Sequence, residues 1–239
     1  MNQSNGEKEI LRIYNELDKF FRTSIGQDEV IDHAAVLQRI SRINPEVNRY
    51  TYELRSFSKL RNMLVHDSNG ANQMPLIEPT EFAVKRYQEL ADLIMKPKRA
   101  LNIAVRASHV FTVKLSDHAT KVMAEMNRKT FTHAPVIQDG KMIGVFSENT
   151  VFAYLVKEKQ SLIDEQTTIG DFKDFIGFND HPSEKFVFVS SNSTAMEIRE
   201  MFSEAVKNGV RIGMIFVTAN GKPKESLLGV ITAWDLAKA

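Results

Sequence analysis

Apolar residues in the first 97 positions recur at the spacing of amphipathic helices. Two stretches place them at i, i+4, i+7 and i+11, namely Ile10, Tyr14, Leu17 and Phe21, and Ala83, Tyr87, Leu90 and Ile94. Two further stretches keep a helical spacing, with Val36, Ile40 and Ile43, and with Leu54, Phe57, Leu60 and Leu64. The pattern predicts four amphipathic helices forming a bundle or a pair of helical hairpins. Pro97 is the expected boundary, because proline cannot continue the last helix.

After about residue 100 the pattern changes to short β runs alternating with helices, and the same order occurs twice. The first copy has apolar runs at 111–113, 134–137 and 142–146, with Ala119, Val122, Met123 and Met126 on the inner face of a helix. The second has runs at 186–189, 213–217 and 227–231, with Ile198, Met201, Phe202 and Ala205 facing inward. The pairs Asp139-Gly140 and Asn220-Gly221 are hairpin turn signals.

The spacing between equivalent positions indicates a duplication. Met126 and Phe202 are 76 residues apart, Pro135 and Gly213 are 78 apart, and Gly144 and Gly229 are 85 apart, so the extra residues fall in loops. Each copy is too small to bury its sheet well alone, and we therefore expect the two to pack into one body with a cleft between them.

Composition narrows the chemistry. The chain has 31 Lys and Arg against 30 Asp and Glu, a net charge of +1, so any nucleic-acid site must be local. The absence of cysteine excludes thiolate catalysis, disulfides and cysteine-ligated metals, and the histidines show no metal-ligand spacing, so no metal is expected. The sequence starts without a basic leader segment and contains no run of about 18 consecutive apolar residues. We therefore expect a cytoplasmic protein with no membrane contact.

The second copy ends on a motif with recognisable chemistry. Gly229-Val230-Ile231-Thr232-Ala233-Trp234-Asp235-Leu236 resembles the closing turn of cystathionine β-synthase (CBS) domains, and residues 101–239 resemble a tandem CBS pair. The resemblance implies an adenosine ligand whose ribose and phosphate are held by Asp235 and Thr232. An ordinary helix cap would use the same two side chains. Trp234 is expected to serve packing.

The first copy departs from that motif. It keeps a hydroxyl at Ser147 but has Thr150 where the aspartate belongs, so we expect one occupied site in the pair. The resemblance also implies basic groups near the ligand phosphate, two residues before a strand proline. His133 precedes Pro135 in this way, and Arg211 precedes Gly213, which replaces the usual proline. Arg211 is the stronger candidate because it is permanently charged.

The segment Arg61-Asn62-Met63-Leu64-Val65-His66 resembles the Arg-x4-His signature of HEPN domains, and residues 1–97 fit their four-helix plan. The resemblance implies a metal-independent ribonuclease in which two protomers meet across a groove. His66 would move the proton of the RNA 2′-hydroxyl, Arg61 would stabilise the transition-state charge, and Asn62 would orient the imidazole or the phosphate. Arg61 and His66 lie about 140° apart around a helix. They can therefore act on the same substrate atom only if the helix end is distorted or if they act across a dimer.

A local basic face agrees with this interpretation. Between Arg39 and Arg61 there are six basic residues against only Glu46 and Glu53. Tyr52, Arg55 and Lys59 share one helix face with Asn62 and His66, as a phosphate track beside a stacking aromatic would. A solvated helix face, with His66 closing the helix against its dipole, would show the same pattern.

The fold class predicted is therefore α+β and multidomain: a HEPN-like four-helix bundle over 1–97 and two β-α-β-β-α CBS units over 101–160 and 168–239. The function predicted is an adenine-nucleotide sensor (AMP, ADP or ATP, with S-adenosylmethionine as a further candidate) that controls a helical output domain. That domain would be an RNase acting on RNA as a homodimer. The alternative is a dimeric adaptor without RNase activity and with an empty cleft.

Overall fold

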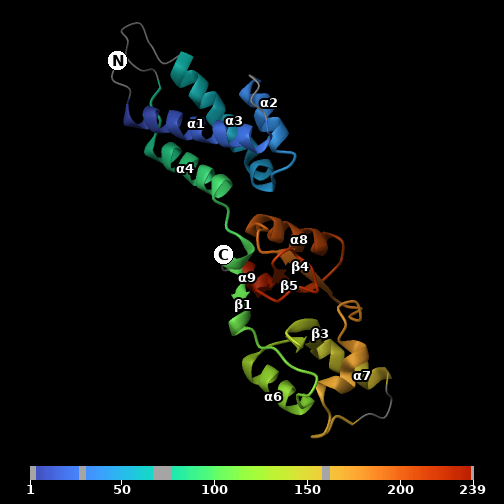
Figure 1. The fold of residues 1–239 in the computed structure, drawn as a ribbon. Coiled ribbons are helices and arrows are strands. Elements are labelled where there is room, and N and C mark those ends of the chain that lie inside the picture. The colour runs from blue at the N-terminus through green and yellow to red at the C-terminus, as the bar shows by residue number, and fades with distance from the viewer. Residues whose placement is uncertain (1–3, 27–30, 67–76, 158–161, 238–239) are drawn as a thin grey trace. The chain divides into compact units, whose positions relative to one another are not determined.

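A computed structural model describes residues 4–26, 31–66, 77–157 and 162–237 (Figure 1). The chain divides into two compact units, Met1–Pro97 (unit 1) and Lys98–Ala239 (unit 2). Each unit has its own hydrophobic core and is described separately below.

Unit 1 consists of helices wherever the structure describes it: α1 (Asn5–Ser24), α2 (His33–Ile40), α3 (Pro45–His66) and α4 (Glu81–Met95). Side-chain caps fix two helix starts, because Ser4 Oγ accepts from the Glu7 amide at 3.2 Å and Thr80 Oγ1 accepts from the Ala83 amide at 3.2 Å. The apolar positions expected on the helix faces lie in the core or pack against it, except for Ala83, which is only partly buried, and Ile43. Ile43 lies beyond the end of α2 and is 67% exposed, so its assignment to that helix was wrong.

Unit 2 opens with α5 (Ala100–Ile103), strand β1 (Val105–Arg106) and a 3₁₀ turn at Ala107–His109. The first copy then contains α6 (Ala119–Lys129), β2 (His133–Gln138), β3 (Lys141–Ser147) and α7 (Glu148–Lys157). A 3₁₀ segment at Ile169–Phe175 leads to the second copy, which contains β4 (Lys185–Ser190), α8 (Ala195–Lys207), β5 (Ile212–Thr218), β6 (Gly229–Ile231) and α9 (Ala233–Ala237).

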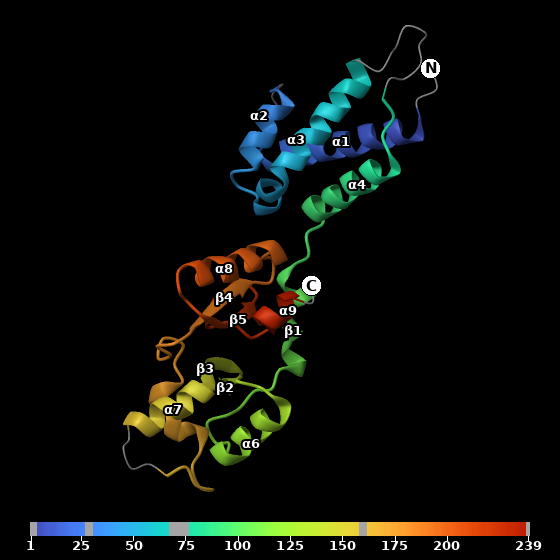
Figure 2. The same cartoon turned by 180° about the vertical axis from the view of Figure 1, so that it is seen from behind.

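The strands of the described residues form two sheets. β2 and β3 make an antiparallel pair, while the second sheet has the order β1-β6-β5-β4, with β4 and β5 parallel and the other pairs antiparallel. Strand β1 precedes the first copy in sequence but pairs with β6 of the second, and both views place it beside α9 (Figures 1 and 2). The chain entering the first copy therefore completes the sheet of the second.

Two equivalent glycines make matching close approaches. A Cβ at Gly229 would lie 2.8 Å from the carbonyl oxygen of Val105, and a Cβ at Gly144 would collide with the carbonyl oxygen of Ile176. In each copy, the segment that crosses this glycine comes from the chain that enters the other copy. The exchange is reciprocal, which gives the duplicated unit the pseudo-symmetry that the spacing predicted.

Several details of the strand and turn assignments were wrong. Residues 111–113 form no strand, and only Val113 makes an isolated bridge, to Val136. Asp139 and Gly140 do form the tight turn between β2 and β3, both with positive φ. Asn220 and Gly221, in contrast, lie eight residues before β6, where Asn220 is held by Glu225 in a longer loop. Met201 is 38% exposed rather than inward-facing.

Candidate functional site

A cavity of about 770 Å³ opens in unit 2 and is lined by residues from both copies. Four of the predicted nucleotide-binding residues lie on its wall: Thr232, Asp235, Arg211 and His133. The apolar part of the wall includes Val105, Val110, Met214 and Val230. An apolar surface with a few polar groups, at this volume, is typical of small-molecule sites.

The turn after β6 places Thr232 and Asp235 side by side. Asp235 Oδ2 accepts two hydrogen bonds from Thr232, one from the backbone N–H at 2.8 Å and one from the hydroxyl at 2.7 Å. The half of the capping box in which the carboxylate accepts from the Thr232 backbone N–H is therefore present, whereas the Thr232 hydroxyl donates to the carboxylate and does not cap the helix. Oδ1 of Asp235 accepts no hydrogen bond from the described residues, so the carboxylate keeps one oxygen for a ligand donor.

His133 begins β2 and is held from both sides. Its Nδ1 lies 2.7 Å from Thr132 Oγ1, and its Nε2 lies 2.8 Å from Glu184 Oε2. The other Glu184 oxygen accepts a hydrogen bond from Asn149 Nδ2 at 3.2 Å. Both imidazole nitrogens are thus engaged within the protein, and His133 reaches the cavity without a free nitrogen for a phosphate.

Glu184 was missed by sequence reasoning, although it is the most completely buried charged side chain at the site, with 0% side-chain exposure. Burial by itself would raise its pKa, but the hydrogen bond and charge of His133, with Asn149 and Arg211, lower the pKa to about 2. His181 stands nearby, with Nδ1 at 3.9 Å from Glu184 Oε1, and burial lowers its pKa. The resulting cluster joins the first copy to the entrance of the second.

Gly213 is explained by this cluster. A Cβ there would lie 2.7 Å from Glu184 Oε2 and 3.1 Å from His133 Nε2, so any larger residue would displace the pair. The glycine at the position of the family proline could have signalled a close approach, but nothing in the sequence indicates what approaches. Arg211, two residues earlier, is exposed on the cavity wall.

Trp234, which was expected to serve packing, is 78% exposed and lines the cavity. It follows Thr232 by two residues, at the start of the short helix α9. An exposed indole beside a cavity offers an aromatic face to a ligand.

The equivalent turn of the first copy is closed. Ser147 and Thr150 are each 1% exposed, and their hydroxyl oxygens lie 3.2 Å apart. Each hydroxyl also accepts from the backbone N–H of the other residue, at 3.0 and 3.2 Å. Ser147 lines a separate cavity of about 250 Å³. The structure therefore does not bring Ser147 together with the other four predicted residues.

In unit 1 the Arg-x4-His residues point in different directions. The Arg61 guanidinium carbon lies 5.0 Å from the centroid of the Tyr14 ring, and Arg61 Nε is buried without a hydrogen-bond partner among the described residues. Asn62 accepts a hydrogen bond from the Arg61 guanidinium at 3.2 Å. His66 is exposed as the last residue of α3. Within one chain, Arg61 is occupied in packing while His66 faces solvent.

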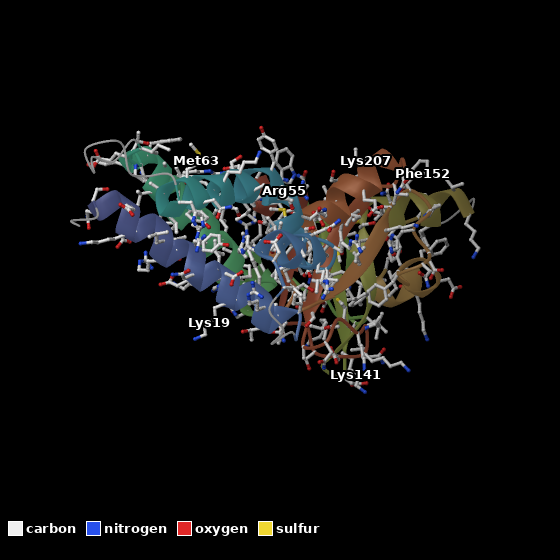
Figure 3. All side chains as sticks on the ribbon, turned by 90° about the horizontal axis from the view of Figure 1, so that it is seen from above. Lys19, Arg55, Met63, Lys141, Phe152 and Lys207 are labelled. Atoms are coloured by element: carbon white, nitrogen blue, oxygen red, sulfur yellow. The ribbon has the colours of Figure 1, made fainter. Side chains whose placement is uncertain are left out.

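The other predicted RNA-binding residues lie on the surface of α3. Tyr52 is 84% exposed, and Arg55 and Lys59 are exposed as well. Arg55 and Met63 both extend from this helix (Figure 3). The face is therefore available for contact.

Two further features concern metals and membranes. In residues 4–26, 31–66, 77–157 and 162–237, no three His, Asp or Glu side chains are grouped so that they could hold a metal ion. None of the helices in that part of the chain is long and apolar enough to cross a membrane.

Unit 2 is similar to known proteins. A family model described as CBS domain matches residues 103–157 and 176–239. Among solved structures, CBSX2 in complex with AMP matches at 18% identity over 59% of this chain and 94% of its own, with a TM-score of 0.42. CbpB in complex with c-di-AMP matches at 17% identity over 64% and 90%, with a TM-score of 0.47. A hemolysin-like CBS protein of Oenococcus oeni matches at 18% identity over 60% and 90%, with a TM-score of 0.40. No curated protein matches the chain.

Proposed function

The chain carries a tandem pair of CBS domains, over residues 103–157 and 176–239, and we propose that this pair senses an adenine nucleotide and controls the helical unit. The observation that carries the proposal is the 770 Å³ cavity, whose lining includes Thr232, Asp235 and Arg211. A carboxylate for ribose hydroxyls, a hydroxyl and guanidinium for phosphate, and apolar walls for a base form a complementary set.

Binding in this cavity would couple the two CBS domains. Its lining includes His109, Val110 and the segment 130–133 from the first copy and the segment 209–214 from the second. A ligand that contacts both copies favours the arrangement in which both contacts are made, and this difference in affinity is the signal that unit 1 would receive.

Isothermal titration with AMP, ADP, ATP and S-adenosylmethionine tests the proposal, using protein verified to be free of copurified nucleotide. We expect one site per chain. The matched variants are Arg211→Ala, which removes the cation on the cavity wall, and Lys141→Ala, which removes an exposed lysine that does not line the cavity. Absence of heat with every ligand, confirmed by absence of a thermal shift, would refute nucleotide sensing.

For unit 1 we propose a HEPN-like output domain over residues 1–97 that cleaves RNA as a homodimer in the cytoplasm. The exposed Tyr52, Arg55 and Lys59, on the α3 surface that ends at His66, support contact with a phosphate backbone. The packing of Arg61 against Tyr14 means that a catalytic role for Arg61 requires it to leave this ring or to act across the dimer.

Cleavage of single-stranded and structured RNA in EDTA tests this second function. His66→Ala is the informative variant, because His66 is exposed and its loss leaves the core intact. Met63→Ala, at a 44% exposed position on the same helix, is the matched control. Loss of cleavage in His66→Ala alone supports catalysis, whereas equal cleavage in both variants points to a contaminating nuclease.

The adaptor without RNase activity is the second candidate, and the packing of Arg61 against Tyr14 favours it. In that case unit 1 would only mediate assembly. Sedimentation equilibrium with and without nucleotide separates the two: a nucleotide-dependent change of assembly state without any RNA cleavage would identify the adaptor.

A further inference from the structure

We propose that Glu184 makes the cavity selective for adenosine ligands that carry a single phosphate group, and that it disfavours di- and triphosphates. The inference rests on the proposed nucleotide function and specifies its ligand class. Glu184 does not line the cavity; it acts through His133, whose Nε2 it occupies, and through its interaction with the charge of Arg211.

The charges on the cavity wall support this selectivity. Arg211 is the only Lys or Arg among the described residues that line the cavity, and Asp235 contributes a negative charge to the same wall. Lys129 packs its ammonium 5.6 and 6.0 Å from the ring centroids of Phe111 and Phe131, which do line the cavity. Its charge is matched by Glu125 at 2.9 Å, so it adds little net positive field.

Glu184 lies directly behind His133. Its carboxylate has 0% side-chain exposure and contacts His133 Nε2 at 2.8 Å, and Gly213 leaves just enough room for the pair. The strongly lowered pKa means that this carboxylate stays charged throughout the physiological range. Because Thr132 occupies the other nitrogen, His133 cannot turn toward a phosphate without breaking two hydrogen bonds.

The consequence follows from the balance of charge. One phosphate group can be matched by the Arg211 guanidinium. Each additional phosphate adds about one negative charge that finds no further Lys or Arg on the described wall, while Glu184 occupies His133 Nε2 and already interacts with the charge of Arg211.

The first experiment uses the unmodified full-length protein. We expect AMP to bind at least about tenfold more tightly than ATP in EDTA. Adding Mg²⁺, which neutralises part of the triphosphate charge, should narrow the difference. Tighter binding of ATP than AMP in EDTA would overturn the proposal and leave nucleotide sensing intact, whereas no binding of any adenosine ligand would overturn both.

The second experiment compares Glu184→Gln with Glu200→Gln, which removes the same charge from an exposed position of α8 outside the cavity. Glu184→Gln should reduce the preference for AMP over ATP by about tenfold, and Glu200→Gln should leave it unchanged. An unchanged preference in a folded Glu184→Gln protein would overturn the role of Glu184. If Glu184→Gln does not fold, the preference of the natural protein for AMP over ATP in EDTA still tests the selectivity of the cavity, and tighter binding of ATP would overturn the proposal.

Discussion

The turns at Ser147 and Thr232 follow equivalent strands of the duplicated unit, yet their side chains are used differently. In the first copy two hydroxyls satisfy each other and are 1% exposed. In the second, a carboxylate receives both hydrogen bonds of Thr232 through one oxygen and lies on the wall of a large cavity. One difference, aspartate in place of threonine at the third position after the hydroxyl, accompanies the change from a closed cap to an open one.

The comparison teaches that a side chain that bonds the start of a helix can still leave an acceptor free. An aspartate has more acceptor sites than the cap requires, whereas a threonine hydroxyl is consumed by it. A duplicated turn can therefore keep its structural role in both copies and offer a binding site in only one.

The largest expected effect comes from removing the acid that distinguishes the copies. Asp235→Ala should weaken binding of AMP by about 100-fold or more, because charge-assisted hydrogen bonds contribute about 1.5–3 kcal/mol each and a ribose offers two hydroxyls. Titration calorimetry measures this effect.

Thr150→Ala is the matched change in the first copy. It should lower stability by about 1–3 kcal/mol through loss of buried hydrogen bonds, with less than about a twofold change in affinity. Equal losses of affinity in both variants would mean that the first turn also contacts the ligand.

The difference between the two turns could be predicted from the sequence. The residues that surround the turns in space could not. The closing motif fixed Thr232 and Asp235 on one turn, because their spacing is local. The role of Glu184 could not be predicted because its partner His133 lies 51 residues away in the sequence. A single glutamate in a loop belongs to no recognisable sequence pattern. The pairing of β1 with the other copy was hidden for a similar reason, since two residues show no periodicity.

The next effect concerns the cluster between the copies. The pKa of Glu184 is lowered to about 2, so its contribution to stability is complete above the unfolded-state pKa and is lost as the pH falls from about 4.5 toward 2. This contribution is at most about 3 kcal/mol, because lowering a pKa by one stabilises the folded state by about 1.4 kcal/mol.

The buried His181 has a lowered pKa, so the unfolded chain takes up its proton first and stability also falls below about pH 6.5.

Urea unfolding at a series of pH values, with hydrogen exchange resolved to peptides of unit 2, checks this profile. Glu184→Gln should be less stable at neutral pH and should flatten the decline below about pH 4.5. A decline of unchanged steepness in that variant would assign the acid sensitivity to other groups.

A smaller effect separates Asn149 from Trp234, which occupy the same position in the two turns. Asn149→Ala should cost about 1–2 kcal/mol of stability, because it removes a hydrogen bond to the buried Glu184. Trp234→Ala should change stability by less than about 0.5 kcal/mol, because the indole is 78% exposed, and should weaken nucleotide binding by about tenfold if its face contacts the ligand. Thermal unfolding and calorimetry on both variants give the comparison, and a large loss of stability in Trp234→Ala would contradict it.

The smallest expected effect tests whether the missing acid alone closes the first copy. Thr150→Asp recreates the hydroxyl-to-carboxylate turn beside Ser147, but the cavity there measures about 250 Å³ and is lined chiefly by Met123, Met126, Phe131, Phe146 and Val151. Ligand sites begin at about 300 Å³, so the cavity as well as the turn restricts binding. We expect the stoichiometry in calorimetry to stay at one nucleotide per chain. Two nucleotides per chain would show that the acid was the sole determinant and that the surrounding side chains yield to a ligand.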